Sequence, residues 1–337
     1  MSTPSVTLAE VARHAGVSQS TVSYVISGKR SISPATRRRV ERSIATLGYH
    51  PHAGARALAS RRSNVIALMV PLREELYLPV MMEFIVAVVT AARGVDHDVL
   101  LLTSAEGAEG VRRVARTAMV DGLVVMDVAM HDERIPALLE AGRPAVLIGV
   151  PESTAGLTCV DLDFYAAGAA CVEHLADLGH RSVAMIGLDP EVYRRGAGFA
   201  ERSLAGFESR ARMRGLRATH HAFDANHDDI GALLARLFDD RDPPTGLVVH
   251  NESVHAPLLE ALRATGRRVP EDVSLVAICP DSMAEQTRPR LSSVHLPAEE
   301  LGRRAVEMLM HKLAGDSAVG ATLLPPVLTA RDSSAAV

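Results

Sequence analysis

The sequence predicts a small all-α N-terminal head followed by a much larger α/β core. Up to residue 63 it has ten Lys and Arg and two Glu, a net charge of +8, so the rest of the chain carries −12 of the total of −4. Helix start and stop signals recur in the first 50 residues, and short apolar runs of strand character recur from residue 64 onward. The 337 residues are enough for roughly two or three domains.

The composition bounds the environment of the chain. Apolar residues make up 47% and aromatic residues only 3%, with no Trp, so aliphatic side chains must build the cores. Cys159, Cys171 and Cys279 show no CxxC spacing, which is typical of a reducing compartment such as the cytoplasm. No signal peptide and no membrane span are expected, because no apolar stretch is long enough.

Three short helices are predicted in residues 1–50. The sequence Thr7-Leu-Ala-Glu10 has the S/T-x-x-E pattern of a capping box, which marks the start of the first helix. Pro34 at a first helical position and glycines after apolar stretches mark other ends. The expected helices are 8–15 after Thr7, 19–27 after Ser18 and 34–47 after Ser33, ended by Gly16, Gly28 and Gly48.

The first two helices, joined by a turn that contains a glycine and braced by the third, predict a helix-turn-helix. The start of the second helix of this motif enters the DNA major groove, where hydroxyl and amide groups hydrogen-bond to base edges and phosphates. Spacing alone also permits a three-helix bundle whose polar face is only solvated. The expected base contacts are Gln19, Ser20 and Tyr24, and the other DNA contacts are Thr7, Ser18, Thr21 and Ser23.

Residues 6–28, VTLAEVARHAGVSQSTVSYVISG, resemble the head of the LacI/GalR family of bacterial transcription regulators. The resemblance continues through residues 36–71, TRRRVERSIATLGYHPHAGARALASRRSNVIALMVP, and covers nearly the whole chain. It implies a cytoplasmic homodimer that binds double-stranded operator DNA and represses transcription. It also implies control by a small effector, with a sugar favoured, and no metal or cofactor.

Residues 51–63 form the expected hinge. The segment PHAGARALAS is rich in Ala but too short to hold alone as a helix in water. The resemblance implies that Leu58 enters the minor groove and that Arg56 lies beside the DNA backbone. His52 stands where the family usually has Asn, and a plain linker helix is the alternative.

The core alternates apolar runs with stretches long enough for crossover helices, which predicts repeated βαβ units and parallel strands. The resemblance implies a periplasmic-binding-protein-like core of two subdomains with a ligand cleft between them. The first subdomain is expected at 64–161 and 293–317, and the second at 162–292 and 318–332. The runs are NVIALMV, DVLLLT, DGLVVMD, PAVLIGV, SVAMIGL, GLVVHN and VSLVAIC.

The cleft departs from the family pattern. Ser203 stands where the family often has an Arg that grips ligand hydroxyls, and Cys279 stands where it has an Asp at a strand end. The low aromatic content also weakens the expectation of a ring stacked on a sugar. The residues expected to bind the effector are Leu78, Pro79, Asp163, Arg202, Asn251 and Asp281.

Two other functions have less support in the sequence. A sugar-metabolising enzyme with a DNA-binding head would need a nucleophile and base or paired carboxylates at strand ends, and the sequence offers no G-x-S-x-G elbow. A metal site in HHAFDANHDD, residues 220–229, is disfavoured, because adjacent His side chains point in opposite directions on a strand. That segment is expected to be a solvated loop. The chain is therefore expected to be a regulator and not an enzyme.

Overall fold

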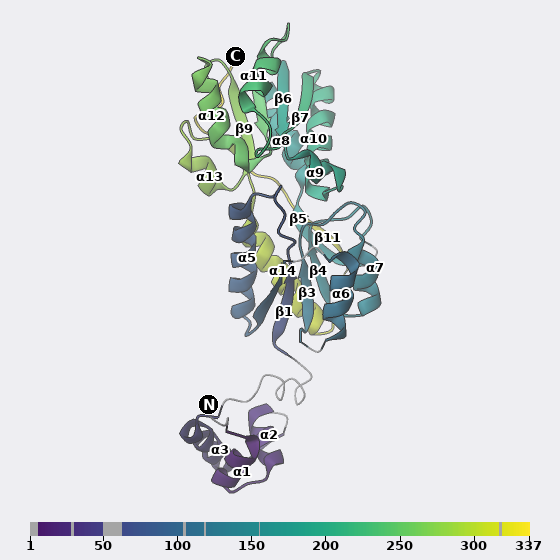
Figure 1. Cartoon of the computed structure of the whole chain (residues 1–337), viewed down its shortest axis with the longest axis vertical. Helices are drawn as coiled ribbons and strands as arrows, with labels where there is room; N and C mark the ends of the chain where they lie inside the picture. The colour runs from purple at the N-terminus through teal and green to yellow at the C-terminus, as the bar shows by residue number, and fades with distance from the viewer. Residues whose placement is uncertain are drawn as a thin grey trace.

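The computed structural model describes residues 6–27, 30–49, 63–103, 106–117, 119–154, 156–316 and 319–337. Three helices form the N-terminal head, and two six-stranded sheets, each covered by helices, form the two lobes of the core (Figure 1). This confirms the predicted fold class. In the part of the chain that the structure describes, no helix is both long enough and apolar enough to cross a membrane.

The head consists of α1 (Leu8–Ala15), α2 (Gln19–Ser27) and α3 (Pro34–Leu47). The capping box at the start of α1 is formed, since the Thr7 side chain accepts from the Glu10 backbone and Glu10 accepts from the Thr7 backbone. Gly16 and Gly48 adopt left-handed conformations that end α1 and α3. The predicted apolar faces meet in a core of Val11, Ala12, Ala15, Val22, Val25, Val40 and Tyr49.

The first lobe contains a parallel sheet in the order β11-β5-β4-β3-β1-β2. Alternate residues of each strand face opposite sides of the sheet, so both faces are apolar and both are covered. Helices α5 and α14 pack on one face, and α6 and α7 pack on the other. The elements are β1 (Val65–Met69), α5 (Leu78–Arg93), β2 (Asp98–Leu102), α6 (Gly107–Arg116), β3 (Gly122–Val125), α7 (Arg134–Ala141), β4 (Ala145–Ile148), β5 (Thr158–Leu162), α14 (Ala298–Leu313) and β11 (Gly320–Leu324).

The second lobe has the strand order β12-β10-β9-β8-β6-β7, in which only β12 is antiparallel to its neighbour. Helices α8 and α10 cover one face, and α11 and α12 cover the other. The elements are α8 (Phe164–Asp177), β6 (Ser182–Gly187), α9 (Pro190–Arg194), α10 (Gly198–Arg214), β7 (Arg217–Ala222), α11 (Ile230–Phe238), β8 (Gly246–Val249), η1 (Glu252–Val254), α12 (His255–Ala264), β9 (Ser274–Cys279), α13 (Asp281–Gln286), β10 (Ser292–His295) and β12 (Leu328–Thr329).

The chain passes between the lobes three times: after β5, after β10 and after β11. The assignment of 318–332 to the second lobe is wrong for β11, which pairs in parallel with β5 and extends the first sheet. Only β12, in which Leu328 faces Val294, belongs to the second sheet. The return crossing expected at residue 293 instead follows β10, because that strand completes its pairing with β9 first.

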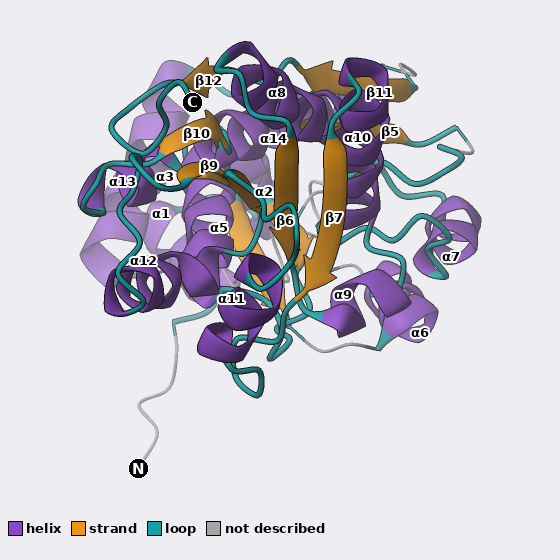
Figure 2. Cartoon of the chain, turned by 90° about the horizontal axis from the view of Figure 1, so that it is seen from above, coloured by secondary structure: helices purple, strands orange, loops and turns teal. Residues whose placement is uncertain are grey.

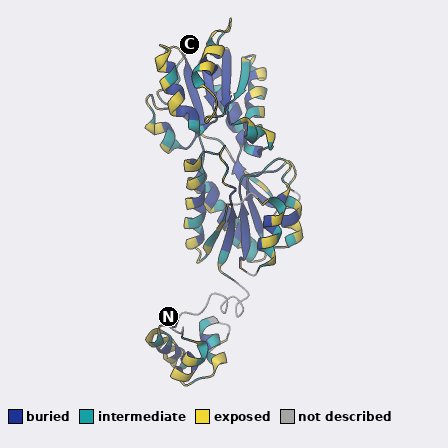
Figure 3. Ribbon diagram, viewed as in Figure 1, coloured by how far each residue is buried: buried dark blue, intermediate teal, exposed yellow. Residues whose placement is uncertain are grey.

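Each of the seven apolar runs contains a strand, and six of these strands form the buried interior of the lobes (Figure 3). The seventh, β2, is a partly exposed edge strand. The view of Figure 2 shows β6 and β7 side by side. The expected loop at 220–229 is wrong for its first residues, since His220 and His221 lie on β7. That strand escaped notice because polar side chains fill this edge position of the sheet.

Candidate functional site

The start of α2 presents a row of short polar side chains. Gln19 and Ser20 are exposed, and Thr21 is partly exposed. Ser18 lies just before the helix, where its hydroxyl accepts from the Thr21 backbone at 3.2 Å and bonds to the Ser20 and Thr21 hydroxyls at 2.8 Å. These bonds fix the orientation of the row, so the surface is preorganised for hydrogen bonding to a groove.

The remaining DNA-contact candidates lie on the same small head. Thr7 is the N-cap of α1, and Ser23 and Tyr24 are partly exposed on α2. The guanidinium of Arg30 lies 5.9 Å from the centre of the Tyr24 ring, a cation–π contact that the sequence reading missed. Arg56 and Leu58, with the rest of hinge residues 51–62, lie outside the described residues.

The chain enters the core at a carboxylate anchor. Asp121, only 9% exposed, accepts hydrogen bonds from the Ser63 backbone and hydroxyl at 2.7 and 2.9 Å and from the Asn64 backbone at 2.9 Å. The ring of His97 approaches the same carboxylate at 3.8 Å. Ser63, the last residue of the expected hinge, and Asn64, which follows it, are therefore fixed to the first lobe.

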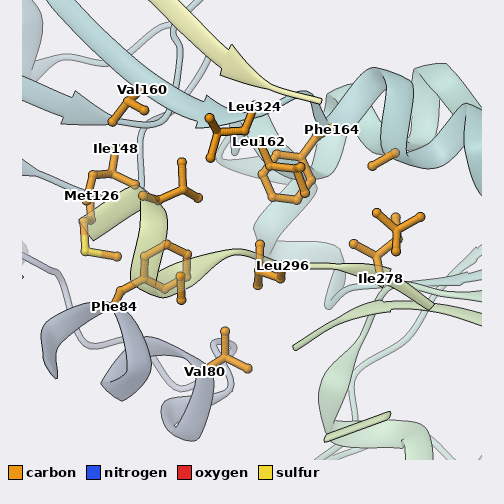
Figure 4. Close-up of a cluster of buried hydrophobic side chains, with 14 of the residues drawn as sticks. Val80, Phe84, Met126, Ile148, Val160, Leu162, Phe164, Ile278, Leu296 and Leu324 are labelled. Carbon is orange, nitrogen blue, oxygen red and sulfur yellow. The ribbon is translucent and has the colours of Figure 1, made fainter. Parts of the chain in front are cut away.

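A cavity of about 760 Å³, including the part open to solvent, lies between the lobes. Its walls come from the start of α5, from strand ends of both sheets and from the crossing segments. Figure 4 shows six of the apolar lining side chains among their buried neighbours: Val80, Phe84, Met126, Ile148, Phe164 and Leu296. The lining also includes Leu76, Tyr77, Met81, Asp127, Val128, Gly149, Asp161, Leu188, Phe199, His250 and Glu252.

Aromatic side chains are concentrated at this cavity. The chain has six Phe and five Tyr, and the rings of Tyr77, Phe84, Phe164 and Phe199 line it. The Phe164 ring stacks on the His250 ring at a centroid distance of 5.8 Å, and Phe199 meets the same imidazole edge-on. The low overall aromatic content is thus a poor guide to the cleft, because four of the eleven Phe and Tyr rings line this one cavity.

His250 forms the polar part of this aromatic cluster. Burial, with His255 and His220 nearby, lowers the pKa of His250 to about 3, so the imidazole is neutral. Its Nδ1 and the Ser203 hydroxyl share a hydrogen bond of 2.7 Å. Ser203 is fully buried, so at the position of the family's Arg this chain has a side chain that supports His250.

Three carboxyl groups line the cavity, and one is paired with arginines. Asp127 at the end of β3 bonds to Arg195 at 2.7 Å and to Arg73 at 3.2 Å, and only 2% of its side chain is exposed. Arg195 belongs to the second lobe, so this pair joins the lobes. Backbone hydrogen bonds from Met130 to Gly196 and from Gly198 to Val128 continue the contact. We call residues 127–130 with residues 195–198 the interlobe latch.

The other two carboxyl groups, Asp161 and Glu252, have no ion pair among the described residues. Asp161 is the residue before the end of β5, is 5% exposed and accepts one hydrogen bond, from the Leu162 backbone at 2.9 Å. Burial raises the pKa of Asp161 to about 7, against the lowering effect of Arg202. Burial raises the pKa of Glu252 to about 7 as well, with Glu83 adding to the increase. The cavity therefore holds two acids that lack a cationic partner.

None of the six residues predicted to bind the effector lines this cavity. Leu78 and Pro79, at the exposed start of α5, line two other pockets. Asp163 caps α8 by accepting from the Ala166 backbone. Arg202 donates to the backbone carbonyls of Val150 and Pro151 in the first lobe.

The other two predicted residues also have structural partners. The Asn251 amide donates to the carbonyls of Gly187 and Phe223 at 3.1 and 2.9 Å. Asp281 pairs with Arg331 at 2.6 Å and with His295 at 3.2 Å. Their close neighbours in sequence line the cavity instead: Leu76, Tyr77, Asp161, His250 and Glu252.

Within the described ranges, no group of three or more His, Cys, Asp or Glu is placed to hold a metal ion. The histidines of β7 have side-chain partners. His220 bonds to the Tyr193 hydroxyl at 3.2 Å and His221 to the Thr219 hydroxyl at 3.0 Å. His227 pairs with Asp224 at 2.7 Å.

Comparisons with known proteins agree with this architecture. Residues 7–52 match the family described as bacterial regulatory proteins, lacI family, and residues 172–334 match the periplasmic binding protein-like domain. The HTH-type transcriptional regulator CelR of Thermobifida fusca is 33% identical over 337 residues, which cover 92% of this chain and 93% of that protein.

Solved structures of similar proteins include two informative complexes. A transcriptional regulator CelR-cellobiose complex matches with a TM-score of 0.67 and 28% identity, over 97% of this chain and 99% of that one. The Lac repressor dimer bound to operator and an anti-inducer matches with a TM-score of 0.83 over 99% of this chain and 100% of that one. At 24% identity, the second likeness shows the fold alone.

Proposed function

The chain belongs to the LacI family of bacterial regulatory proteins and is a DNA-binding transcriptional regulator; from this premise we propose that it is a repressor whose operator affinity is set by a small effector in the interlobe cavity. The observation that carries the proposal is that the same chain has hydroxyl groups held in place at the start of α2 and a cavity between its two lobes. Because its partner is chromosomal DNA, we place it in the cytoplasm.

For DNA recognition, we propose that Gln19, Ser20 and Tyr24 contact base edges. Thr7, Ser18, Thr21 and Ser23 then contact phosphates, which set the register of the head on the duplex. Arg56 and Leu58 of the hinge are assigned on the family resemblance, with Leu58 as a wedge that opens a base step in the minor groove. Replacing Leu58 by Gly should weaken operator binding without changing the melting temperature of the core.

We propose that two copies of the chain bind one palindromic operator, since two heads read two half-sites one helical turn apart. An exposed apolar row on α5 supports a self-interface: Leu78, Met82 and Val86 are 52%, 44% and 56% exposed at i, i+4 spacing. A contiguous exposed apolar surface of this kind marks an interaction site. Sedimentation of the purified chain tests the dimer, and Met82→Glu should shift it to monomer.

Control by an effector follows from the position of the cavity. A ligand that contacts both lobes favours one angle between them, and the first lobe holds Ser63 and Asn64 at the end of the hinge through Asp121. DNA and effector must then change each other's affinity by the same factor. The cellobiose complex of the similar CelR supports a sugar-like effector for this chain. We propose binding without turnover, and conversion of a bound ligand by the purified chain would contradict this.

The experiment begins by selecting an operator from random duplex DNA with the purified full-length chain. Fluorescence anisotropy then measures the affinity of the selected site for the native chain, for Gln19→Ala and for a control, Thr46→Ala, which removes an exposed hydroxyl from α3. The proposal predicts weaker binding for Gln19→Ala only. Equal operator affinities of all three chains would show that α2 is not the helix that reads the DNA sequence.

A further inference from the structure

The charged side chains that line the interlobe cavity are all acidic, which bears on the charge of its ligand. No Lys or Arg lines the cavity, whereas Asp127, Asp161 and Glu252 do. His250 is neutral, and its Nδ1 is already hydrogen-bonded to Ser203. An anionic ligand such as a sugar phosphate would find carboxylates and no counter-charge. The cavity therefore disfavours anions.

The arginines nearest to the cavity already have partners. Arg195 and Arg73 neutralise Asp127, and Arg195 also approaches Glu75 at 3.5 Å. Arg202 donates to two backbone carbonyls across the lobes. A ligand that recruited Arg202 would have to break its contacts with the first lobe. Two nitrogens of the Arg195 guanidinium have no hydrogen-bond partner among the described residues, but Arg195 does not line the cavity. They are thus part of the scaffold around the cavity.

Asp161 and Glu252 are the two acids left without a cation. Asp161 is more than nine-tenths buried, and one of its two carboxylate oxygens accepts no hydrogen bond from the described residues. No described side chain donates a hydrogen bond to Glu252, and its charged neighbour Glu83 repels it. A buried carboxylate such as that of Asp161 normally has a paired cation or several donors, and Glu252 is partly exposed. Here one carboxylate comes from each lobe, and the space between the lobes is the cavity.

We propose that the sugar-like effector is also an organic cation, a small molecule whose protonated amine binds Asp161 and Glu252 and whose ring packs against the aromatic lining. The inference rests on the proposed function of the cavity as the effector site. Tyr77, Phe84, Phe164 and Phe199 favour a cation through their ring faces and an apolar ring through contact. A ligand with many hydroxyls and no amine finds few partners among the other lining residues, which are mainly aliphatic.

Matched ligand sets test this with the full-length chain. One set is cyclohexylmethylamine, cyclohexylmethanol and cyclohexanecarboxylate, and the other is glucosamine, glucose and glucuronate. Thermal shift followed by calorimetry at neutral pH should show that the amine of at least one set binds more tightly than its alcohol and its acid. The proposal is overturned if an alcohol or an acid binds more tightly than its matched amine, or if neither amine binds.

Variants assign the selectivity to the two carboxyl groups. Asp161→Asn and Glu252→Gln should each weaken binding of the amine by ~tenfold or more, because each removes a charge-assisted hydrogen bond. Binding of the matched alcohol should change little, so the ratio of the two affinities falls. A merely structural role would lower both affinities together and would overturn the assignment. Asp229→Asn is the control, because it removes an exposed charge while Asn can still cap α11.

Operator binding measured separately distinguishes this inference from the proposed function. If the chain binds no selected DNA, the regulator proposal fails, while the preference for amines is still decided by calorimetry. If glucose binds more tightly than glucosamine and releases DNA, the regulator proposal stands and the cation is overturned. If an amine binds in the cavity and operator affinity does not change, the ligand class is supported and control by the effector fails.

Discussion

The reading face of α2 and the interlobe cavity differ in how far apart in the sequence their residues lie. The face uses exposed and partly exposed residues from one short stretch, Ser18 to Tyr24, and hydrogen bonds among Ser18, Ser20 and Thr21 orient its start. The cavity uses residues from position 76 to position 296, most of them apolar, with two unpaired carboxyl groups. A contact surface of local residues can change without disturbing the core, whereas the cavity shares its residues with the contacts that join the lobes.

The largest effect is expected from the pH dependence of the cavity. In Asp161→Asn the folded chain loses a carboxyl whose pKa burial raises to about 7, with Arg202 opposing and Asp163 adding to the increase. Between pH 4 and 7 the folded native chain keeps a proton that the unfolded chain has released, so native stability falls as pH rises and levels above pH 7. From pH 5 to 8 this loss is at most about 3 kcal/mol and should be absent in the variant.

Urea unfolding at four pH values between 5 and 8 measures this difference. Burial and Glu83 also raise the pKa of Glu252. The stability of Asp161→Asn should therefore still fall as pH rises, but less steeply than that of the native chain. Parallel pH profiles of the native and variant chains would show that Asp161 is not held as a buried, unpaired acid. A buried, unpaired acid would then no longer distinguish the cavity from the solvated face of α2.

The latch should show that the cavity depends on contacts between the lobes. Replacing Arg195 by Ala leaves the buried Asp127 with Arg73 as its one ion-pair partner among the described residues. The free energy of unfolding should fall by about 2–3 kcal/mol, somewhat less than for a buried pair that loses its sole partner. Affinity for a cavity ligand should fall too. Calorimetry on Arg194→Ala, whose exposed ion pair with Glu191 lies outside the latch, gives the control.

A substitution in the head should affect DNA binding and leave the core and its cavity unchanged. Gln19→Ala is expected to weaken operator binding by about 1–3 kcal/mol, the usual value for a bidentate base contact. Core stability and affinity for a cavity ligand should not change, because no residue of α2 contributes to the lining. Anisotropy and calorimetry on the same preparation measure both. A parallel loss of ligand affinity would mean that the two regions are not separable.

The hinge anchor links the two regions and should have the smallest effect. Asp121→Ala removes the acceptor of three hydrogen bonds from Ser63 and Asn64. Operator affinity should decrease by about 1–2 kcal/mol, since the hinge leaves the core in a less fixed direction. Ligand binding should remain normal, because Asp121 does not line the cavity. Retention of full operator affinity would show that the core controls the head by another route.

The same contrast explains what the sequence could predict. The helices of the head were placed correctly because their signals are local: Thr7 and Glu10 close a capping box, and Gly16 and Gly48 end helices. The central strands were equally evident, since a parallel strand buried on both faces is a continuous apolar run. The assignment of β11 failed, because a half-exposed edge strand carries no local sign of which sheet it joins.

At several places the residue predicted to bind the effector lies one or two positions from a residue that lines the cavity. Asp163 was predicted and Asp161 lines the cavity, and Asn251 was predicted where His250 and Glu252 line it. Asp163 lies beyond the end of β5 and caps α8. Side chains one position apart at a strand end point to different sides, as Asn251 and its neighbours do. A family pattern therefore identifies the segment but not which residue faces the ligand. The pairing of Ser203 with His250, 47 positions apart, likewise depends on packing that spacing cannot reveal.

The central claim is that one chain couples a DNA-reading face to a ligand cavity. The most direct test is the operator dissociation constant of the full-length chain, measured with and without a saturating ligand from the matched sets. The account predicts a change of roughly 5- to 150-fold, and an equal change in ligand affinity when operator DNA is saturating. A ligand that binds the native chain but not Glu252→Gln, yet leaves the operator dissociation constant unchanged, would contradict it.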